Sequence, residues 1–261
     1  MLTLYDAGLS PFAQKVKMVL AAKELPFERK VPDLAAPPPE FLAVSPRREV
    51  PVLVDGATAV FDSSIIVDYL EERWPQRPVL PASPAERARV RMIAALCDSQ
   101  LEAIIFGMTE IIAFKRDTGP VGEGLLEKGR ADLATFLAWL SEQLGDREWF
   151  NGDAYGFGDM AVLPYMQTAS LYKAAPTPDS PLGRWFARAR VQPGFQACIA
   201  DAKAEVAAFR AAAEKVMSGQ WPREYRDHRL DWIIRAGGIE MVRAGLADGT
   251  IRLSRLAGAA S

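Results

Sequence analysis

The feature that most limits the fold of this chain is a change in hydrophobic periodicity near residue 80. Before that point apolar residues form short runs separated by turns, whereas after it they recur at helical spacing up to about residue 217. A chain of 261 residues is long enough for two ordinary domains. We therefore expect one unit over residues 1–80, a second over 83–217, and an additional segment over 218–261.

The first unit alternates strand and helix signals, which is typical of an α/β domain. The expected elements are a strand at Leu2–Tyr5, a helix from Ser10, a strand at Pro26–Val31, a helical patch around Phe41, a hairpin over Val50–Phe61 and a helix from Asp62. The predicted order is therefore β-α-β-α-β-β-α.

The second unit is predicted to be all-α. Ser83-Pro84 has the pattern of an N-cap followed by proline at the first helical position, and long amphipathic patterns follow it. Asp159 stands three residues after Gly156, where the acidic member of a capping box reaches back to free backbone donors. Beyond Met217, Ser218-Gly219-Gln220 is a plausible joint to the additional segment.

Composition excludes several classes of function. The 31 basic and 33 acidic residues give a net charge of −2, so no positive field attracts nucleic acid. His228 is the sole histidine, and with two separated cysteines it forms no ordinary transition-metal site. Cys97 and Cys198 make no disulfide framework, which favours a reducing compartment. With no leader and no uninterrupted apolar span, we expect a cytoplasmic protein without membrane or metal.

Ser10 is the first candidate for chemistry. Serine before proline is a preferred helix N-cap, and that role alone explains its position. A hydroxyl at the positive end of a helix is also well placed to donate a hydrogen bond to a bound thiolate, so the two roles are compatible. Tyr5 is a second possible donor, although an aromatic strand residue more often packs in a core.

Two further pairs of residues are candidate ligand contacts. A cis bond at Val50-Pro51 would let the Val50 main chain pair with an extended peptide, whereas a trans proline would merely enter an edge strand. Asp62-Ser63 starts the next helix, where free amides can hold a carboxylate and Asp62 can hold an ammonium group. Simple capping is the alternative for that pair.

Taken in order, these residues resemble the cytosolic glutathione transferase family. The resemblance covers residues 1 to about 217 and rests on the following motifs: Ser10-Pro11-Phe12, Lys15-Val16, Ser45-Pro46, Val50-Pro51-Val52-Leu53, Asp62-Ser63 and Tyr69-Leu70. It implies an N-terminal thioredoxin-like domain, a C-terminal helical-bundle domain and a homodimer.

The resemblance also implies roles for individual residues. Ser10 would be the thiolate-stabilising hydroxyl of the serine-type classes, with Phe12 beside it in the glutathione site. Val50 would pair with the cysteinyl backbone of glutathione next to a cis Pro51. Asp62 and Ser63 would hold the γ-glutamyl end, and Asp159 would be a folding element.

The sequence departs from the family pattern in two places. The residues before Val50 are Arg48 and Glu49, and a carboxylate there would repel the glycine carboxylate of glutathione unless Arg47 or Arg48 compensates. The segment from Trp221 exceeds the usual family length and is rich in arginine, with Arg223, Arg226, Arg229, Arg235 and Arg243. It would close over the acceptor cleft, extend a dimer contact, bind another protein or pack along the helical domain.

Two functions follow from this interpretation. The first is an enzyme that adds the glutathione thiolate to a small apolar electrophile, with glutathione as co-substrate. The acceptor site would lie on the helical unit, lined by Phe106, Met108, Ile112 and Phe114 with Tyr165 or Tyr172; packing in the core is the alternative for most of these residues. The second is a non-catalytic scaffold of the same fold that binds a protein partner through its C-terminal extension. Disulfide exchange is disfavoured because position 10 is serine and the first unit has no cysteine.

Overall fold

A mixed four-stranded sheet forms the first unit, with strands in the order β2-β1-β3-β4. The computed structural model describes residues 1–221, 230, 233–234, 236–248 and 250. The elements of the first unit are β1 (Leu2–Tyr5), α1 (Pro11–Ala22), β2 (Phe27–Lys30), α2 (Pro39–Val44), β3 (Val52–Asp55), β4 (Thr58–Phe61) and α3 (Ser63–Arg73). The predicted β-α-β-α-β-β-α order is confirmed.

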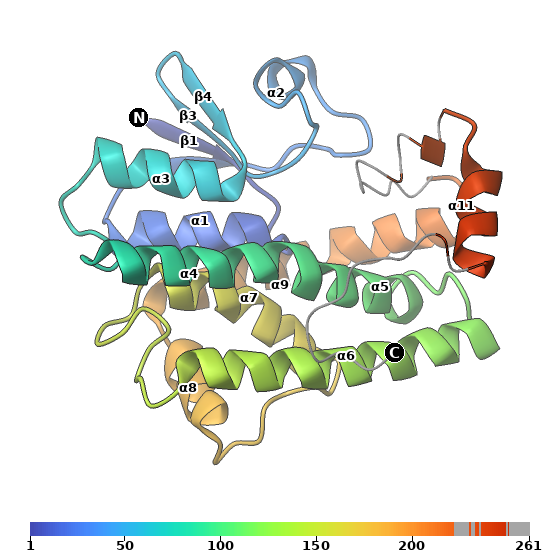
Figure 1. Cartoon of the computed structure of the whole chain (residues 1–261). Helices are drawn as coiled ribbons and strands as arrows, with labels where there is room; N and C mark the ends of the chain where they lie inside the picture. The colour runs from blue at the N-terminus through green and yellow to red at the C-terminus, as the bar shows by residue number, and fades with distance from the viewer. Residues whose placement is uncertain (222–229, 231–232, 235, 249, 251–261) are drawn as a thin grey trace.

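Helices make up the rest of the described chain. They are α4 (Pro84–Leu96), the π-helical turn η1 (Cys97–Leu101), α5 (Glu102–Ile112), α6 (Pro120–Leu144), α7 (Phe157–Leu171), α8 (Pro181–Ala189), α9 (Pro193–Met217) and α11 (Ile239–Ala247). Figure 1 shows α1 between the sheet and these helices, and α1 contacts both α7 and α9. The α/β plus all-α fold class is therefore confirmed.

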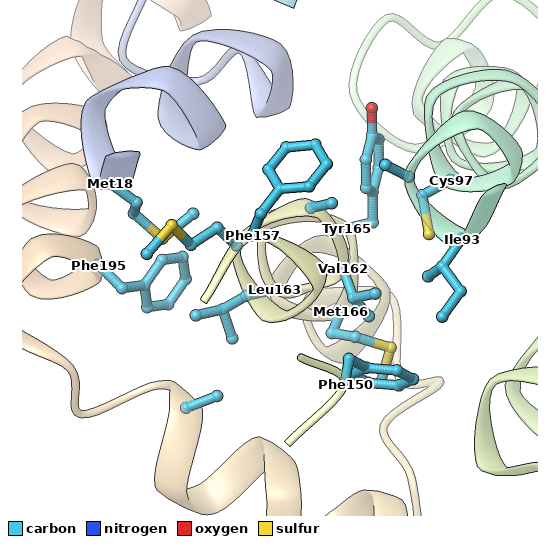
Figure 2. Packing of buried hydrophobic residues seen from close by; sticks show 14 of the residues in the cluster. Met18, Ile93, Cys97, Phe150, Phe157, Val162, Leu163, Tyr165, Met166 and Phe195 are labelled. Carbon is cyan, nitrogen blue, oxygen red and sulfur yellow. The ribbon is translucent and has the colours of Figure 1, made fainter. Parts of the chain in front are cut away.

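One continuous hydrophobic cluster joins the two parts of the chain. It includes Leu4 and Leu53 of the sheet as well as Phe195 of α9. In Figure 2, Phe157 of α7 lies toward Met18 of α1, whereas Tyr165 on the same helix lies toward η1. Because α7 packs on both sides, the first helix and the η1 turn have fixed positions relative to each other.

The helical run Pro84–Ile112 has a local irregularity that the periodicity did not predict. Its hydrogen-bond pattern widens at η1, which carries Cys97 and Asp98. Within the described residues this is the one run long and apolar enough to cross a membrane, with mean hydropathy 1.3 over its most apolar window and 33% of that window buried. This run packs against α6 and α7.

The last long helix ends just before the additional segment over residues 218–261. Helix α9 ends at Met217, and Gly219 has a positive φ of 75°, which suits the end of a helix. In α11, Arg243 pairs with Glu240 at 2.7 Å. The other residues singled out in this segment, Arg223, Arg226, His228, Arg229 and Arg235, lie outside the described residues.

Candidate active site

Three loops converge at one end of the sheet. Tyr5, the last residue of β1, lies opposite Val52, the first residue of β3. Val52 in turn lies opposite Phe61, the last residue of β4. The turn that follows β1, the residues that precede β3 and the residues that follow β4 are therefore neighbours. They carry Ser10, Val50-Pro51 and Asp62-Ser63, which the sequence places far apart.

Ser10 is the N-cap of α1. Its Oγ accepts a hydrogen bond from the Ala13 amide at 3.3 Å, and its side chain is half-buried. This cap uses an oxygen lone pair, so the hydroxyl proton remains available to an acceptor outside the helix. The first turn of α1 contains no acidic residue, which leaves the positive end of the helix dipole open to an anion. Capping and anion binding are thus geometrically compatible at Ser10.

The peptide bond between Val50 and Pro51 is cis, as the resemblance implied. Ser45 holds the preceding segment, because its Oγ donates to the Glu49 carbonyl at 2.9 Å and accepts from the Glu49 amide at 3.1 Å. The Val50 main chain makes no hydrogen bond to another described residue. Its N–H and C=O groups are therefore free to pair with an extended ligand.

Arg47 pairs with Glu49, the residue at which the sequence departs from the family pattern. Its Nε lies 2.7 Å from Glu49 Oε2, and its Nη1 lies 3.8 Å from Asp62 Oδ2. The Glu49 carboxylate thus has a cation beside it, which reduces its repulsion of another carboxylate. The arginine also links the segment before β3 to the start of α3.

Asp62 combines a cap with an unusual backbone. Its Oδ1 accepts from the Ser64 amide at 3.0 Å, while its φ is +72°. That conformation is costly for a residue with a side chain, by about 1–3 kcal/mol, and such residues concentrate at functional sites. Asp62 is exposed and Ser63 is buried, so a carboxylate faces solvent directly beside the amides of the α3 N-terminus.

Residues from four elements form a polar cluster behind this end of the sheet. Asp98 of η1 is its centre: it contacts Lys15 Nζ, accepts from Tyr165 Oη at 3.0 Å and lies 3.4 Å from Ser64 Oγ. Lys15 is 1% exposed, and Asp98 is the carboxylate that pairs with its buried ammonium group. The sequence indicated Lys15 only as part of a motif and gave no signal for Asp98, because the partners are 83 residues apart.

Phe12 borders the same cluster. Its ring meets the ring of Tyr165 edge-on, with centroids 6.3 Å apart, and the Lys15 ammonium lies 6.0 Å from its centroid. Glu102 follows Asp98 along the chain, and burial together with the Asp98 charge raises the pKa of Glu102 to about 7. The interior next to Phe12 is therefore aromatic, with one ion pair and a carboxyl group that is only partly ionised near neutral pH.

The other candidate residues from the sequence are either buried in the core or half-buried. Tyr5 is buried with its ring 5.3 Å from that of Phe41, which is the packing arrangement rather than a donor site. Met108, Phe114 and Tyr165 are likewise buried. Phe106, Ile112 and Tyr172 are half-buried, and Tyr172 Oη lies 2.7 Å from Thr109 Oγ1.

Asp159 has the structural role expected of it. It is fully buried, and its carboxylate accepts from the Gly156 amide at 3.1 Å, the Phe150 amide at 2.8 Å and Trp185 Nε1 at 2.7 Å. Burial nevertheless raises the pKa of Asp159 to about 6, because the hydrogen bonds only partly offset desolvation. This residue organises the start of α7.

The two thiols are unsuited to catalysis. Burial raises the pKa of Cys97 far above its usual range and that of Cys198 to about 12. Nucleophilic cysteines require the thiolate, so neither is activated. Among the described residues, no group of three or more histidine, cysteine, aspartate or glutamate side chains is arranged to hold a metal ion.

Comparison with known proteins identifies the family. Residues 4–78 match the family model for the N-terminal domain of glutathione S-transferase. Glutathione S-transferase U6 of Arabidopsis thaliana is 30% identical over 160 residues, which are 60% of this chain and 67% of the relative. The chain belongs to the glutathione S-transferase family.

Solved structures of glutathione transferases agree with this assignment. The enzyme from Rhodospirillum rubrum F11 is 30% identical, with a TM-score of 0.67 over 76% of this chain and 91% of that one. A rice glutathione transferase crystallised with glutathione is 25% identical, with a TM-score of 0.66 over 82% and 96% of the two chains. The resemblance seen in the sequence is confirmed, and with it the class of enzyme.

A relative that is named for its location and not for an enzymatic activity also matches this transferase. FtsZ-localized protein A of Caulobacter vibrioides is 25% identical over 207 residues, which are 76% of this chain and 91% of the relative. The fold is therefore shared with a protein named for its location.

Proposed function

We propose that this glutathione transferase adds the glutathione thiolate to a small apolar electrophile, with Ser10 stabilising the thiolate. The observation that carries the proposal is the Ser10 cap: Oγ accepts from the Ala13 amide at 3.3 Å, a bond that uses a lone pair and not the hydroxyl proton. A free thiol has a pKa of about 8.5, so it is mostly protonated at neutral pH. A hydrogen bond and a helix dipole that favour the anion lower that pKa.

The proposed reaction needs only glutathione and the electrophile, with no further cofactor. The glutathione thiol releases its proton to solvent, and the sulfur lone pair then forms a bond to the electrophilic carbon. In a substitution the leaving group departs with the electron pair of its bond, whereas in an addition the carbanion takes up a proton. The protein contributes thiol ionisation and positioning.

The tripeptide is proposed to lie along the end of the sheet. The unpaired Val50 main chain would pair with the cysteinyl residue, next to cis Pro51. The exposed Asp62 carboxylate would bind the γ-glutamyl ammonium, while the amides around Ser63 would hold its carboxylate. Phe12 would border the sulfur on the side of Tyr165. The rice relative with bound glutathione supports this choice of co-substrate.

The larger organisation belongs to the same proposal. Residues 1–80 would form the thioredoxin-like glutathione-binding domain and residues 83–217 the helical domain that lines the acceptor site, with 218–261 as an extension. Membership of the family supports a homodimer and a cytoplasmic location.

The alternative is a scaffold of the same fold that binds a protein partner through its C-terminal extension. It is favoured by the match to FtsZ-localized protein A and by Glu49, whose carboxylate stands where the glycine carboxylate of glutathione would approach. The two functions differ in a measurable property, because only the enzyme must bind glutathione.

The test combines binding with turnover. Titration calorimetry with glutathione measures affinity, and 1-chloro-2,4-dinitrobenzene serves as a general electrophile for kcat/KM. We expect binding by the wild-type chain, a loss of about 100-fold in kcat/KM for Ser10→Ala, and retention of most activity in Ser10→Thr. No heat at millimolar glutathione would favour the scaffold, and equal rates for wild type and Ser10→Ala would remove Ser10 from the mechanism.

A further inference from the structure

The turn that presents Ser10 is fastened to the last long helix. We call residues 6–10 the Ser10 turn. The amide of Gly8 in this turn donates to Oε2 of Glu205 on α9 at 2.7 Å. The carbonyl of Gly8 accepts from Gln14 Nε2 of α1 at 2.7 Å. Both backbone groups of Gly8 are therefore held, one by α9 and the other by the helix that Ser10 caps.

The contact between the turn and α9 is close. A Cβ atom at Gly8 would lie 3.0 Å from both the carbonyl carbon and the carbonyl oxygen of Asp201. Backbone atoms within a helix do not yield as a flexible side chain does, so even alanine would push the turn away from α9. The glycine at this position is thus explained by its approach to a second element.

An ion network surrounds this contact. Asp6, which is fully buried, pairs with Lys17 at 2.9 Å, and Lys17 also pairs with Asp201 at 2.8 Å. Arg29 of β2 contacts both Asp6 and Glu205. Two carboxylates one helical turn apart on α9 therefore share cations of the first unit. Such a network holds Glu205 in one place.

We propose that Glu205 is a positioning residue for the Ser10 hydroxyl. Its carboxylate anchors the Gly8 amide, and the turn passes this constraint to Ser10 because the Ser10 amide donates to the Ala7 carbonyl at 2.9 Å. The inference rests on the proposed function, since it concerns the hydroxyl that would stabilise the glutathione thiolate. Hydrogen bonds to a reacting atom require placement within about 0.5 Å, so release of the turn weakens this one.

The direction in which substitution of Glu205 changes the thiol pKa separates a positioning role from a purely electrostatic one. Glu205 is an anion, so removing its charge alone favours a nearby thiolate and lowers the thiol pKa. Loss of the Gly8 anchor weakens the Ser10 hydrogen bond and raises that pKa. Glu205→Ala and Glu205→Gln distinguish the two causes, because the glutamine side chain keeps an oxygen that accepts from the Gly8 amide.

The experiment follows the ultraviolet absorbance of the thiolate in the protein–glutathione complex as a function of pH. We expect Glu205→Ala to raise the apparent thiol pKa by about one unit and to lower kcat/KM about tenfold at pH 6.5, with the deficit narrowing toward pH 9. Glutathione affinity should change less than about threefold, because the proposed backbone and γ-glutamyl contacts remain.

Two variants serve as controls within the same network. Glu205→Gln should titrate at or slightly below the wild-type thiol pKa even though its ion pair with Arg29 is lost. Asp201→Asn removes a carboxylate that pairs with Lys17 but does not bind the turn backbone, so it should reduce stability without raising the thiol pKa. Gly8→Ala should reproduce the Glu205→Ala titration by moving the turn instead of the helix.

The inference is overturned if folded Glu205→Ala titrates at or below the wild-type thiol pKa, or if Glu205→Gln shifts as far upward as Glu205→Ala. If Glu205→Ala does not fold, the other two variants decide the question. A raised thiol pKa in Gly8→Ala together with an unraised one in Glu205→Gln supports the inference. Any other pair of results overturns it. Failure of the proposed function is distinguishable, because the wild-type complex itself would then show no lowered thiol pKa.

Discussion

The ammonium group of Lys15 contacts the carboxylate of Asp98, which ties α1 to the turn η1 in the middle of the α4–α5 helical run. Lys15 is 1% exposed and the Asp98 side chain 16% exposed, so this ion pair is shielded from water. Its position behind Ser64 and Phe12 makes it a support for the end of the sheet where the candidate site lies.

The first prediction concerns this pair. Lys15→Met should lower the free energy of unfolding by about 3–5 kcal/mol, because it leaves a largely buried carboxylate without its cation. Adding Asp98→Asn should recover part of the loss, since the amide still accepts from Tyr165 but carries no charge. Urea denaturation measures both. Lys128→Met, which removes an exposed lysine that pairs with Asp132 on the same helix, is the control and should change stability by less than about 1 kcal/mol. A small effect of Lys15→Met would contradict the assigned support.

The second prediction separates the capping of α3 from ligand binding. Asparagine tolerates a positive φ and caps helices, so Asp62→Asn should keep the wild-type stability. It loses the charge proposed for the γ-glutamyl ammonium, and KM for glutathione should rise about tenfold with little change in kcat. Steady-state kinetics at varied glutathione measure this. Asp68→Asn, on the same helix at an exposed pair with Arg91, should leave KM unchanged. Equal KM values in all three proteins would exclude Asp62 from the site.

The third prediction is a pH dependence of stability. The pKa of Glu102 is raised to about 7 in the folded chain, so the folded state disfavours the ionised form. Stability from the protonated group is complete below its ordinary pKa and is lost as pH rises through about 7. Glu102→Gln should therefore be more stable than wild type at pH 8.5, by about 1–2 kcal/mol after allowance for partial exposure, and closer to wild type at pH 5.

Urea midpoints at the two pH values test this difference. Glu127→Gln, at an exposed position on α6, controls for a general effect of removing one negative charge. A Glu102→Gln advantage that is the same at both pH values would be inconsistent with the raised pKa.

The fourth prediction concerns Asp159. Alanine there leaves buried donors from Phe150, Gly156 and Trp185 without an acceptor, so Asp159→Ala should lose at least about 3 kcal/mol and much of its soluble yield. Asp159→Asn retains one oxygen acceptor and should be intermediate. Thermal unfolding compares these variants with Asp153→Ala, which changes an exposed neighbour in the same loop. Similar transitions for Asp159→Ala and Asp153→Ala would refute the structural role.

Local patterns predicted most of the fold. The strand at Leu2–Tyr5 was predicted with its observed ends, and the hairpin predicted over Val50–Phe61 is formed by β3 and β4. The N-caps at Ser10 and Asp62 were also predictable, because capping depends on residues within one helical turn.

The features that the sequence did not predict depend on contacts between residues that are far apart in the chain. The turn η1 lies within a regular apolar pattern, and its widened hydrogen bonding coincides with the placement of Asp98 against α1 and α7. The contact between Gly8 and Glu205 spans 197 residues, so no local pattern indicates it. Arg47, which pairs with Glu49 and reaches Asp62, was indicated only as one of two candidates for compensation.

The most direct measurement of the central claim is a pH titration of the glutathione thiolate bound to wild-type protein and to Ser10→Ala, followed by ultraviolet absorbance. The proposed mechanism predicts a wild-type thiol pKa about one to two units below that of free glutathione and a value close to free glutathione in the variant. Superimposable titrations of the two complexes would contradict it.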